Sequence, residues 1–216
     1  MLYLVVPTVV GYLGFGLLIV TVLFGGGAFD RDDAWLVYLI LAGYTLGLGA
    51  TAVSRLLQNS FYALGDTKTP AKIAVARVTV SAALGAALMF WLDGFGVAEV
   101  LGLPVPDEPL TLAAVGLAVG SSAGAWVELA VLQRALRRHT AAFRLPAARA
   151  LQMLGLAGLA AVPAALVFVV VPETWNVAVR ALLVVGVFGP AYLALGHALG
   201  FEEGEAWVGR FTRRLK

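Results

Sequence analysis

One apolar stretch of the chain carries a row of polar side chains. Six polar residues recur there at intervals that suit one face of a helix: Tyr44, Thr51, Arg55, Gln58, Asn59 and Tyr62. A charged side chain at the centre of a membrane helix costs about 3 kcal/mol on insertion scales, and such residues usually face water or partner helices rather than lipid. The pattern favours a water-filled cavity lined by Arg55, and snorkelling of its long side chain to the membrane surface is the alternative.

Two further charges lie inside apolar segments. Arg77 sits about one turn inside the segment that follows, with Ser81 one turn further on, and cavity lining and snorkelling suit it equally. Glu128 could pair with Arg134 or with an arginine of the cavity, or it could end a packed helix face near the membrane surface. We favour the packed face for Glu128.

Composition indicates an integral membrane protein. The 216 residues are 61% hydrophobic and 13% charged, whereas a soluble domain carries roughly a quarter charged residues. There is no cysteine, which excludes a disulfide framework and a cysteine nucleophile, and the two histidines are far apart. We find no catalytic set, metal site, cofactor motif or nucleic-acid surface. The sequence therefore predicts a protein that moves a substrate rather than an enzyme.

Six segments have the roughly 20 apolar residues that a helix needs to cross a bilayer. We predict an all-α membrane protein with six transmembrane helices in residues 1–199 and a cytoplasmic amphipathic tail in residues 200–216. The predicted spans are residues 2–26, 34–63, 71–92, 110–135, 148–171 and 177–199.

Lysine and arginine gather in alternate connections. They occur in the second connection, in the fourth and in the tail, whereas the third and fifth contain none. The positive-inside rule then places these regions, and both termini, in the cytoplasm. Met1 opens directly into an apolar segment without a basic start, which argues against a signal peptide and favours a truncated chain.

Small residues recur at helical spacing in two segments. Gly43 and Gly47 share one face, and Gly116, Gly120 and Gly124 form a stripe that continues to Glu128. Stripes of this kind allow helix backbones to approach closely within a membrane. We expect these glycines to pack helices rather than to carry chemistry.

A short polar turn separates the second span from the third. It contains Gly65, Asp66, Thr67, Lys68, Thr69 and Pro70. Gly65 can end the preceding helix in a left-handed conformation, Asp66 or a threonine can cap the next helix, and Pro70 suits its first turn. Capping explains most of the turn without a function, but it does not explain Arg55.

The residues from Arg55 to Lys72 resemble the segment that joins the eighth and ninth helices of the MurJ (MviN) lipid II flippases. The run from Phe24 to Phe29 is similar to the extracellular turn after that family's seventh helix. The resemblance implies a six-helix C-terminal lobe of a two-lobe fold of the multidrug/oligosaccharidyl-lipid/polysaccharide exporter type. The residues Gly65, Asp66, Thr67, Thr69 and Pro70 are then a signature turn on the cytoplasmic side.

The resemblance also implies a function. The family flips lipid-linked peptidoglycan precursor to the outer leaflet of the bacterial cytoplasmic membrane by alternating access, through a cationic cavity that suits a pyrophosphate. The expected contacts are Arg55 with Thr51, Asn59 and Tyr62, and, more weakly, Arg77. The expected partners are the lipid-linked precursor, the bilayer and an N-terminal six-helix lobe that this chain lacks. Two alternatives stay open: export of another polyprenyl-linked glycan, and a membrane scaffold subunit that transports nothing.

Overall fold

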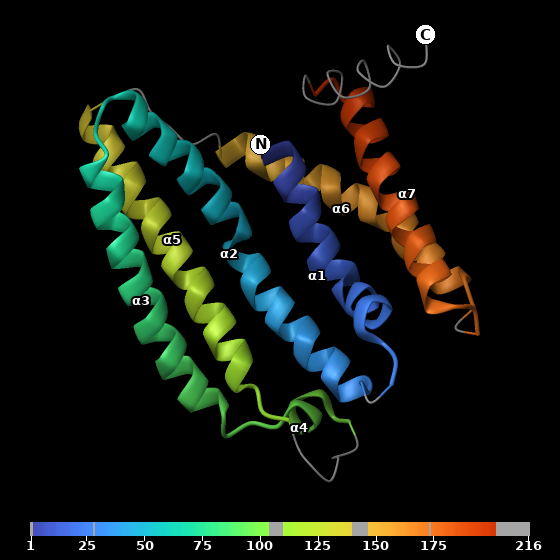
Figure 1. Ribbon diagram of the computed structural model, residues 1–216. Coiled ribbons are helices and arrows are strands. Elements are labelled where there is room, and N and C mark those ends of the chain that lie inside the picture. Colours follow the sequence, from blue (N-terminus) through green and yellow to red (C-terminus); the bar gives the residue numbers. More distant parts are fainter. Residues whose placement is uncertain (1, 28, 104–109, 140–146, 173, 202–216) are drawn as a thin grey trace. The chain divides into compact units, whose positions relative to one another are not determined.

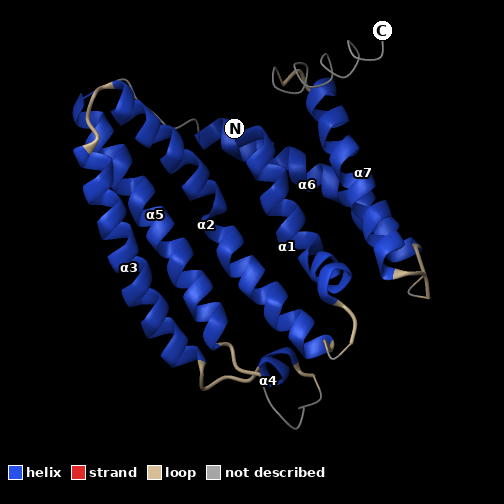
Figure 2. Ribbon diagram, in the orientation of Figure 1, coloured by secondary structure: helices blue, strands red, loops and turns tan. Residues whose placement is uncertain are grey.

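The computed structural model describes residues 2–27, 29–103, 110–139, 147–172 and 174–201, and these are almost entirely helical (Figure 2). Six helices in this part of the chain are long and apolar enough to cross a membrane, which confirms the predicted all-α class with six spans. The predicted amphipathic tail lies almost wholly outside the described residues, because the description ends at residue 201.

The helices fall into two units. Unit 1 contains α1 (Leu2–Phe24), α6 (Ala147–Val170) and α7 (Val177–Ala198), and unit 2 contains α2 (Arg31–Ala63), α3 (Lys68–Leu92), α4 (Val97–Leu101) and α5 (Ala113–His139). Their assembly into a single six-helix lobe stays a prediction.

Helices α2 and α3 begin earlier than the predicted spans, at charged residues. Helix α2 starts at Arg31 because Asp30 accepts hydrogen bonds from the backbone N–H groups of Asp32 and Asp33, and the Asp33 side chain accepts from Asp30 N. This reciprocal capping box draws charged residues into the first helical turn. Helix α3 starts at Lys68, where Asp66 accepts from the backbone N–H groups of Lys68 and Thr69.

The short helix α4 was not predicted. It lies in the connection between α3 and α5, and its residues Val97 and Ala98 are buried. Backbone hydrogen bonds hold the connection together, from Val97 N to Leu110 O at 2.8 Å and from Leu112 N to Phe95 O at 3.0 Å. A helix of five residues is too short to show a hydrophobic period, so hydropathy could not reveal it.

In unit 2, α5 lies between α3 and α2 and packs against both (Figure 1). A Cβ atom added at Gly116 would lie 2.6 Å from the backbone of Leu88, and one added at Gly47 would lie 2.7 Å from Ser122 Cα. Neither site has room for a side chain. The two glycine stripes are therefore packing surfaces, as the sequence predicted, and α5 uses one face for α3 and another for α2.

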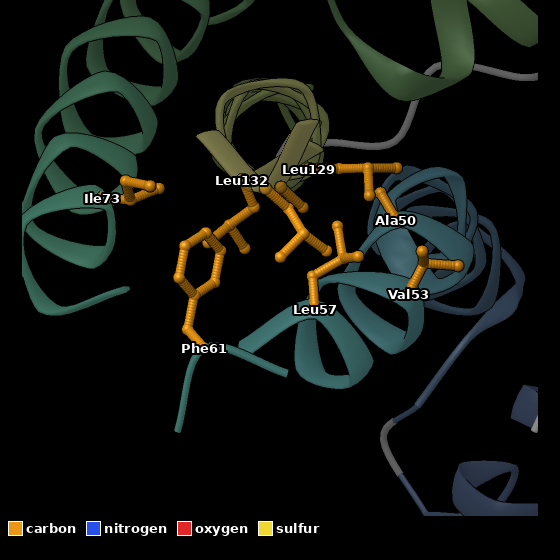
Figure 3. Packing of buried hydrophobic residues seen from close by; sticks show 9 residues of the cluster. Ala50, Val53, Leu57, Phe61, Ile73, Leu129 and Leu132 are labelled. Atoms are coloured by element: carbon orange, nitrogen blue, oxygen red, sulfur yellow. The ribbon is translucent and has the colours of Figure 1, made fainter. Parts of the chain in front are cut away.

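An apolar cluster joins the three long helices of unit 2 near the turn between α2 and α3. Figure 3 shows Leu57 of α2 pointing toward Leu129 and Leu132 of α5, with the ring of Phe61 beside Leu132 and Ile73. Phe61 and Leu132 are completely buried. The cluster fixes which face of α2 turns toward α5.

Unit 1 is held together by aromatic contacts. The Tyr192 hydroxyl of α7 donates to the backbone carbonyl of Tyr3 in α1 at 2.9 Å, and the centroids of the two rings lie 4.9 Å apart. Further along the same pair of helices, the rings of Phe15 and Phe188 meet edge to face at 5.9 Å. Helix α6 packs against α7. Large side chains therefore join α1 to α7.

Candidate substrate-contact face and its support

The polar row of α2 lies mostly on the exposed surface of unit 2. Arg55, Asn59 and Tyr62 are exposed, and Thr51 is half-buried. Side chains two positions apart in an α-helix point in directions about 160° apart. Arg55 therefore points away from the buried Leu57. We call Thr51, Arg55, Asn59 and Tyr62 the Arg55 face. No described residue of unit 2 forms an ion pair with Arg55.

Contacts with α5 hold the first half of α2. Ser122 Oγ donates to the carbonyl oxygen of Gly43 at 2.5 Å, and Trp126 Nε1 donates to that of Leu46 at 2.9 Å. Both bonds end on backbone atoms, so they directly fix the position of α2 along its axis and its rotation about that axis. The glycines of α2 make these bonds possible because they let the two backbones come together.

A buried carboxylate holds the second half of α2. The Glu128 side chain, on α5, is only 1% exposed. Its Oε2 accepts from Arg77 Nη1 of α3 at 2.8 Å, and its Oε1 accepts from Gln58 Nε2 of α2 at 2.9 Å. One carboxylate thus joins three helices, and each of its oxygens has a donor. We call Gln58, Arg77 and Glu128 the carboxylate network.

This network corrects two expectations. Glu128 does not simply end a packed face, because it pairs with Arg77 and not with Arg134. Gln58 leaves the polar row to bind Glu128, although its spacing places it beside Arg55. The sequence did contain a signal: Glu128 lies four residues after Gly124, in a stripe that packs against α3, and a Cβ at Gly124 would lie 3.1 Å from the carbonyl oxygen of Arg77. Arg77 therefore lies across the stripe from Glu128.

The polar turn after α2 has a local structural role. Gly65 adopts φ of 75°, and two backbone bonds close the helix end, from Gly65 N to Tyr62 O and from Asp66 N to Phe61 O, both at 3.0 Å. This pattern is a Schellman motif, in which only glycine fits the left-handed position without strain. Pro70 is buried in the first turn of α3, and Thr67 makes no side-chain capping bond. Capping by Asp66 therefore explains the turn locally.

Comparison with known proteins gives a consistent result. Residues 1–105 match the model of the family described as lipid II flippase MurJ. A probable lipid II flippase MurJ of Rhizobium tropici is 40% identical over 80 residues, which are 37% of this chain and 15% of that protein. The protein of the same description from Rickettsia prowazekii is 28% identical over 131 residues, 61% of this chain and 22% of that protein.

A solved structure extends the likeness in fold to most of the chain. The lipid II flippase MurJ in an inward closed conformation superposes with a TM-score of 0.58 at 19% identity, covering 92% of this chain and 37% of that one. At this identity the superposition shows the fold alone. The matched regions are thus only part of each relative's length. Residues 1–105 are thus similar to the lipid II flippase MurJ family, and the chain spans less than half the length of each relative that it matches.

Proposed function

We propose that this chain is the C-terminal half of a flippase that moves lipid-linked peptidoglycan precursor from the inner to the outer leaflet by alternating access. The observation that carries the proposal is the family match over residues 1–105, because this range contains the whole of α2 and its exposed Arg55 face. The matched relatives bear the description of probable lipid II flippases, and their substrate is the one we propose here.

The chemistry of the Arg55 face suits a pyrophosphate headgroup. A guanidinium keeps its charge at any physiological pH and presents a planar fork of donors that matches two phosphate oxygens. Asn59 and Tyr62, one and two turns further along the exposed side of α2, add an amide and a hydroxyl that can donate to phosphate or sugar oxygens. Thr51 adds a second hydroxyl one turn before Arg55.

Arg77 is left out of this contact set. Its Nη1 is bound to a buried carboxylate at 2.8 Å, so the charge of its guanidinium is already balanced within unit 2. Among the described residues of unit 2, Arg55 has no such acidic partner, so its charge is available to an anion. The proposed contacts are therefore Arg55, Asn59, Tyr62 and Thr51.

The proposal also gives the chain an orientation in the membrane and an N-terminal partner lobe. The distribution of lysine and arginine supports cytoplasmic termini and a cytoplasmic turn between α2 and α3, in the bacterial cytoplasmic membrane. A six-helix N-terminal lobe would face the exposed side of α2 and enclose the headgroup, while the lipid tail stays in the bilayer. Alternating access would then consist of rocking between the two lobes.

The test is genetic. We would replace the corresponding segment of a MurJ relative with this chain and express the chimera in a strain depleted of its own flippase. Arg55→Ala should lower transport about tenfold or more, because a charge-assisted hydrogen bond to the headgroup is lost. Arg55→Lys should keep part of the activity, since it retains the charge but not the fork.

Arg134→Ala is the matched control, because Arg134 is also an exposed arginine but lies on α5, away from the Arg55 face. It should transport like the unmodified chimera. Full rescue by Arg55→Ala at normal membrane levels would sink the proposed headgroup contact.

A further inference from the structure

The carboxylate network is the part of unit 2 that the proposed function does not explain. Glu128 lies inside a candidate membrane span, and its side chain is 1% exposed. A buried carboxylate in such a place is unfavourable unless donors surround it, and it is usually linked to function. The donors here come from two other helices, so the acid does more than balance one neighbouring charge.

The geometry divides the network into two separate bonds. Arg77 Nη1 binds Oε2 at 2.8 Å, and Gln58 Nε2 binds Oε1 at 2.9 Å. The first bond balances the charge of the carboxylate, and Arg77 is the only basic partner recorded for it among the described residues. The second bond adds no charge. Its effect is to hold the side of α2 at a fixed point on α5.

That fixed point lies beside the Arg55 face. Gln58 is three residues after Arg55 and directly precedes Asn59, so a bond at Gln58 limits the rotation of α2 at the level of both side chains. The bonds from Ser122 and Trp126 end at Gly43 and Leu46, about two turns or more before Arg55. The apolar contacts around Leu57 lie close to Arg55 along α2, but apolar contacts are less directional than a hydrogen bond.

We propose that Glu128 is a positioning residue, which orients the Arg55 face through its hydrogen bond to Gln58, and that Arg77 is its counter-ion and not a substrate contact. The inference rests on the proposed function for its transport consequence, but not for its structural one. The Arg55 face contacts the substrate, and Glu128 of α5 determines the direction in which that face points.

Two double variants separate the hydrogen bond from the charge pair. Arg77→Met with Glu128→Gln removes both charges and keeps an amide oxygen that can accept from Gln58. Arg77→Met with Glu128→Met also removes both charges, at similar side-chain volume, but leaves Gln58 without that acceptor. Replacement of a buried ion pair by apolar residues of similar volume is often tolerated, so both variants should fold. The two variants differ only in whether the side chain at position 128 offers Gln58 a hydrogen-bond acceptor.

Transport is the first readout, in the chimera described above. The Met/Gln variant should keep most of the activity, and the Met/Met variant should lose about tenfold or more, because a displacement of about 1 Å at a contact residue can have effects of that size or larger. Equal transport by the two variants at equal membrane levels would overturn the positioning role. A large loss in both variants would overturn the counter-ion role, because it would show that the charge of Arg77 is itself required.

The second readout does not depend on transport. The chain has no cysteine, so Leu56→Cys on α2 and Val78→Cys on α3 can carry a unique pair of spin labels, and both positions are exposed. Electron–electron distance measurements should give one narrow distribution for the unmodified chain and the Met/Gln variant, and a broadened or shifted one for Met/Met. Identical distributions in all three would refute the proposal even if Arg55→Ala abolishes transport. If the distance distribution shifts in Met/Met while Arg55→Ala keeps full transport activity, the positioning of α2 by Glu128 is upheld and the headgroup contact is rejected.

Discussion

Units 1 and 2 differ in which contacts dominate between their helices. Unit 2 uses glycines that bring backbones into contact, together with hydrogen bonds from Ser122, Trp126 and Gln58. Unit 1 uses the rings of Tyr3, Phe15, Phe188 and Tyr192. An apolar groove of about 390 Å³ remains between α1 and α7, lined by Pro7, Gly11 and Phe188 among others. Unit 2 therefore allows less repacking than unit 1.

This difference in packing explains why a buried carboxylate can lie in unit 2. A buried ion needs donors at fixed positions, and fixed positions need helices that cannot slide. The close approach of α5 to α3 and α2 provides this for Glu128. Ring contacts in unit 1 tolerate small shifts, since two rings can tilt without losing their contact. The proposed substrate-contact face lies on the unit whose helix registers are fixed by close backbone contact.

The largest expected effect comes from a side chain placed on the glycine stripe. Gly120→Val should destabilise unit 2 by about 3 kcal/mol or prevent its folding, because a Cβ there would overlap the backbone of Gly85. Gly186→Ala in unit 1 is the control, since among the described residues the added Cβ would meet no atom within 4 Å beyond the nearby backbone of its own helix. Thermal unfolding in detergent would measure both. Similar stability of the two variants would remove the contrast between the units.

A smaller effect is expected from the aromatic pair of unit 1. Tyr192→Phe keeps the ring and removes the hydroxyl that donates to Tyr3 O, so it should lower stability by about 1 kcal/mol. Tyr44→Phe, at an exposed position of α2, should be neutral in the same unfolding assay. A loss of several kcal/mol for Tyr192→Phe would show that unit 1 also depends on a directional polar contact.

Effects of similar size to that of Tyr192→Phe are expected from two serines of unit 2. Ser54 Oγ is buried and has no hydrogen-bond partner among the described residues, so Ser54→Ala should be neutral or stabilise by up to about 1 kcal/mol. Ser122→Ala should instead destabilise by about 1 kcal/mol, because it removes the bond to Gly43 O. The difference between the two variants in the unfolding midpoint measures how much of the α2–α5 contact is polar. Equal midpoints would show that the hydrogen bond from Ser122 contributes little to the stability of unit 2.

Hydropathy and spacing predicted the features that depend on local sequence. The six spans follow from apolar length, and the packing role of Gly116 and Gly120 follows from their spacing. The capping box at Asp30 was missed because charged residues were assigned to the connection, although their spacing suits a first helical turn. Helix ends depend on such local bonds, and hydropathy does not register them.

The carboxylate network could not be predicted from one segment alone. Glu128 had two candidate kinds of partner in the sequence, and the choice of Arg77 depends on which face of α5 meets α3. Gln58 likewise looked like a member of the exposed row until α5 was placed beside it. Contacts between residues 51 and 70 positions apart depend on tertiary packing, which a helical pattern alone does not specify. The roles of Arg55, Asn59, Tyr62 and Thr51 stay a prediction.

One measurement tests the headgroup contact most directly. A photoactivatable amino acid at Asn59, on the Arg55 face, would be compared with one at Val78, an exposed position of α3, in chimeras supplied with radiolabelled lipid II. We expect Asn59 to cross-link to the lipid-linked precursor, Val78 not to do so, and Arg55→Ala to abolish the Asn59 product. Equal cross-linking at both positions, or an Asn59 product that survives Arg55→Ala unchanged, would contradict it.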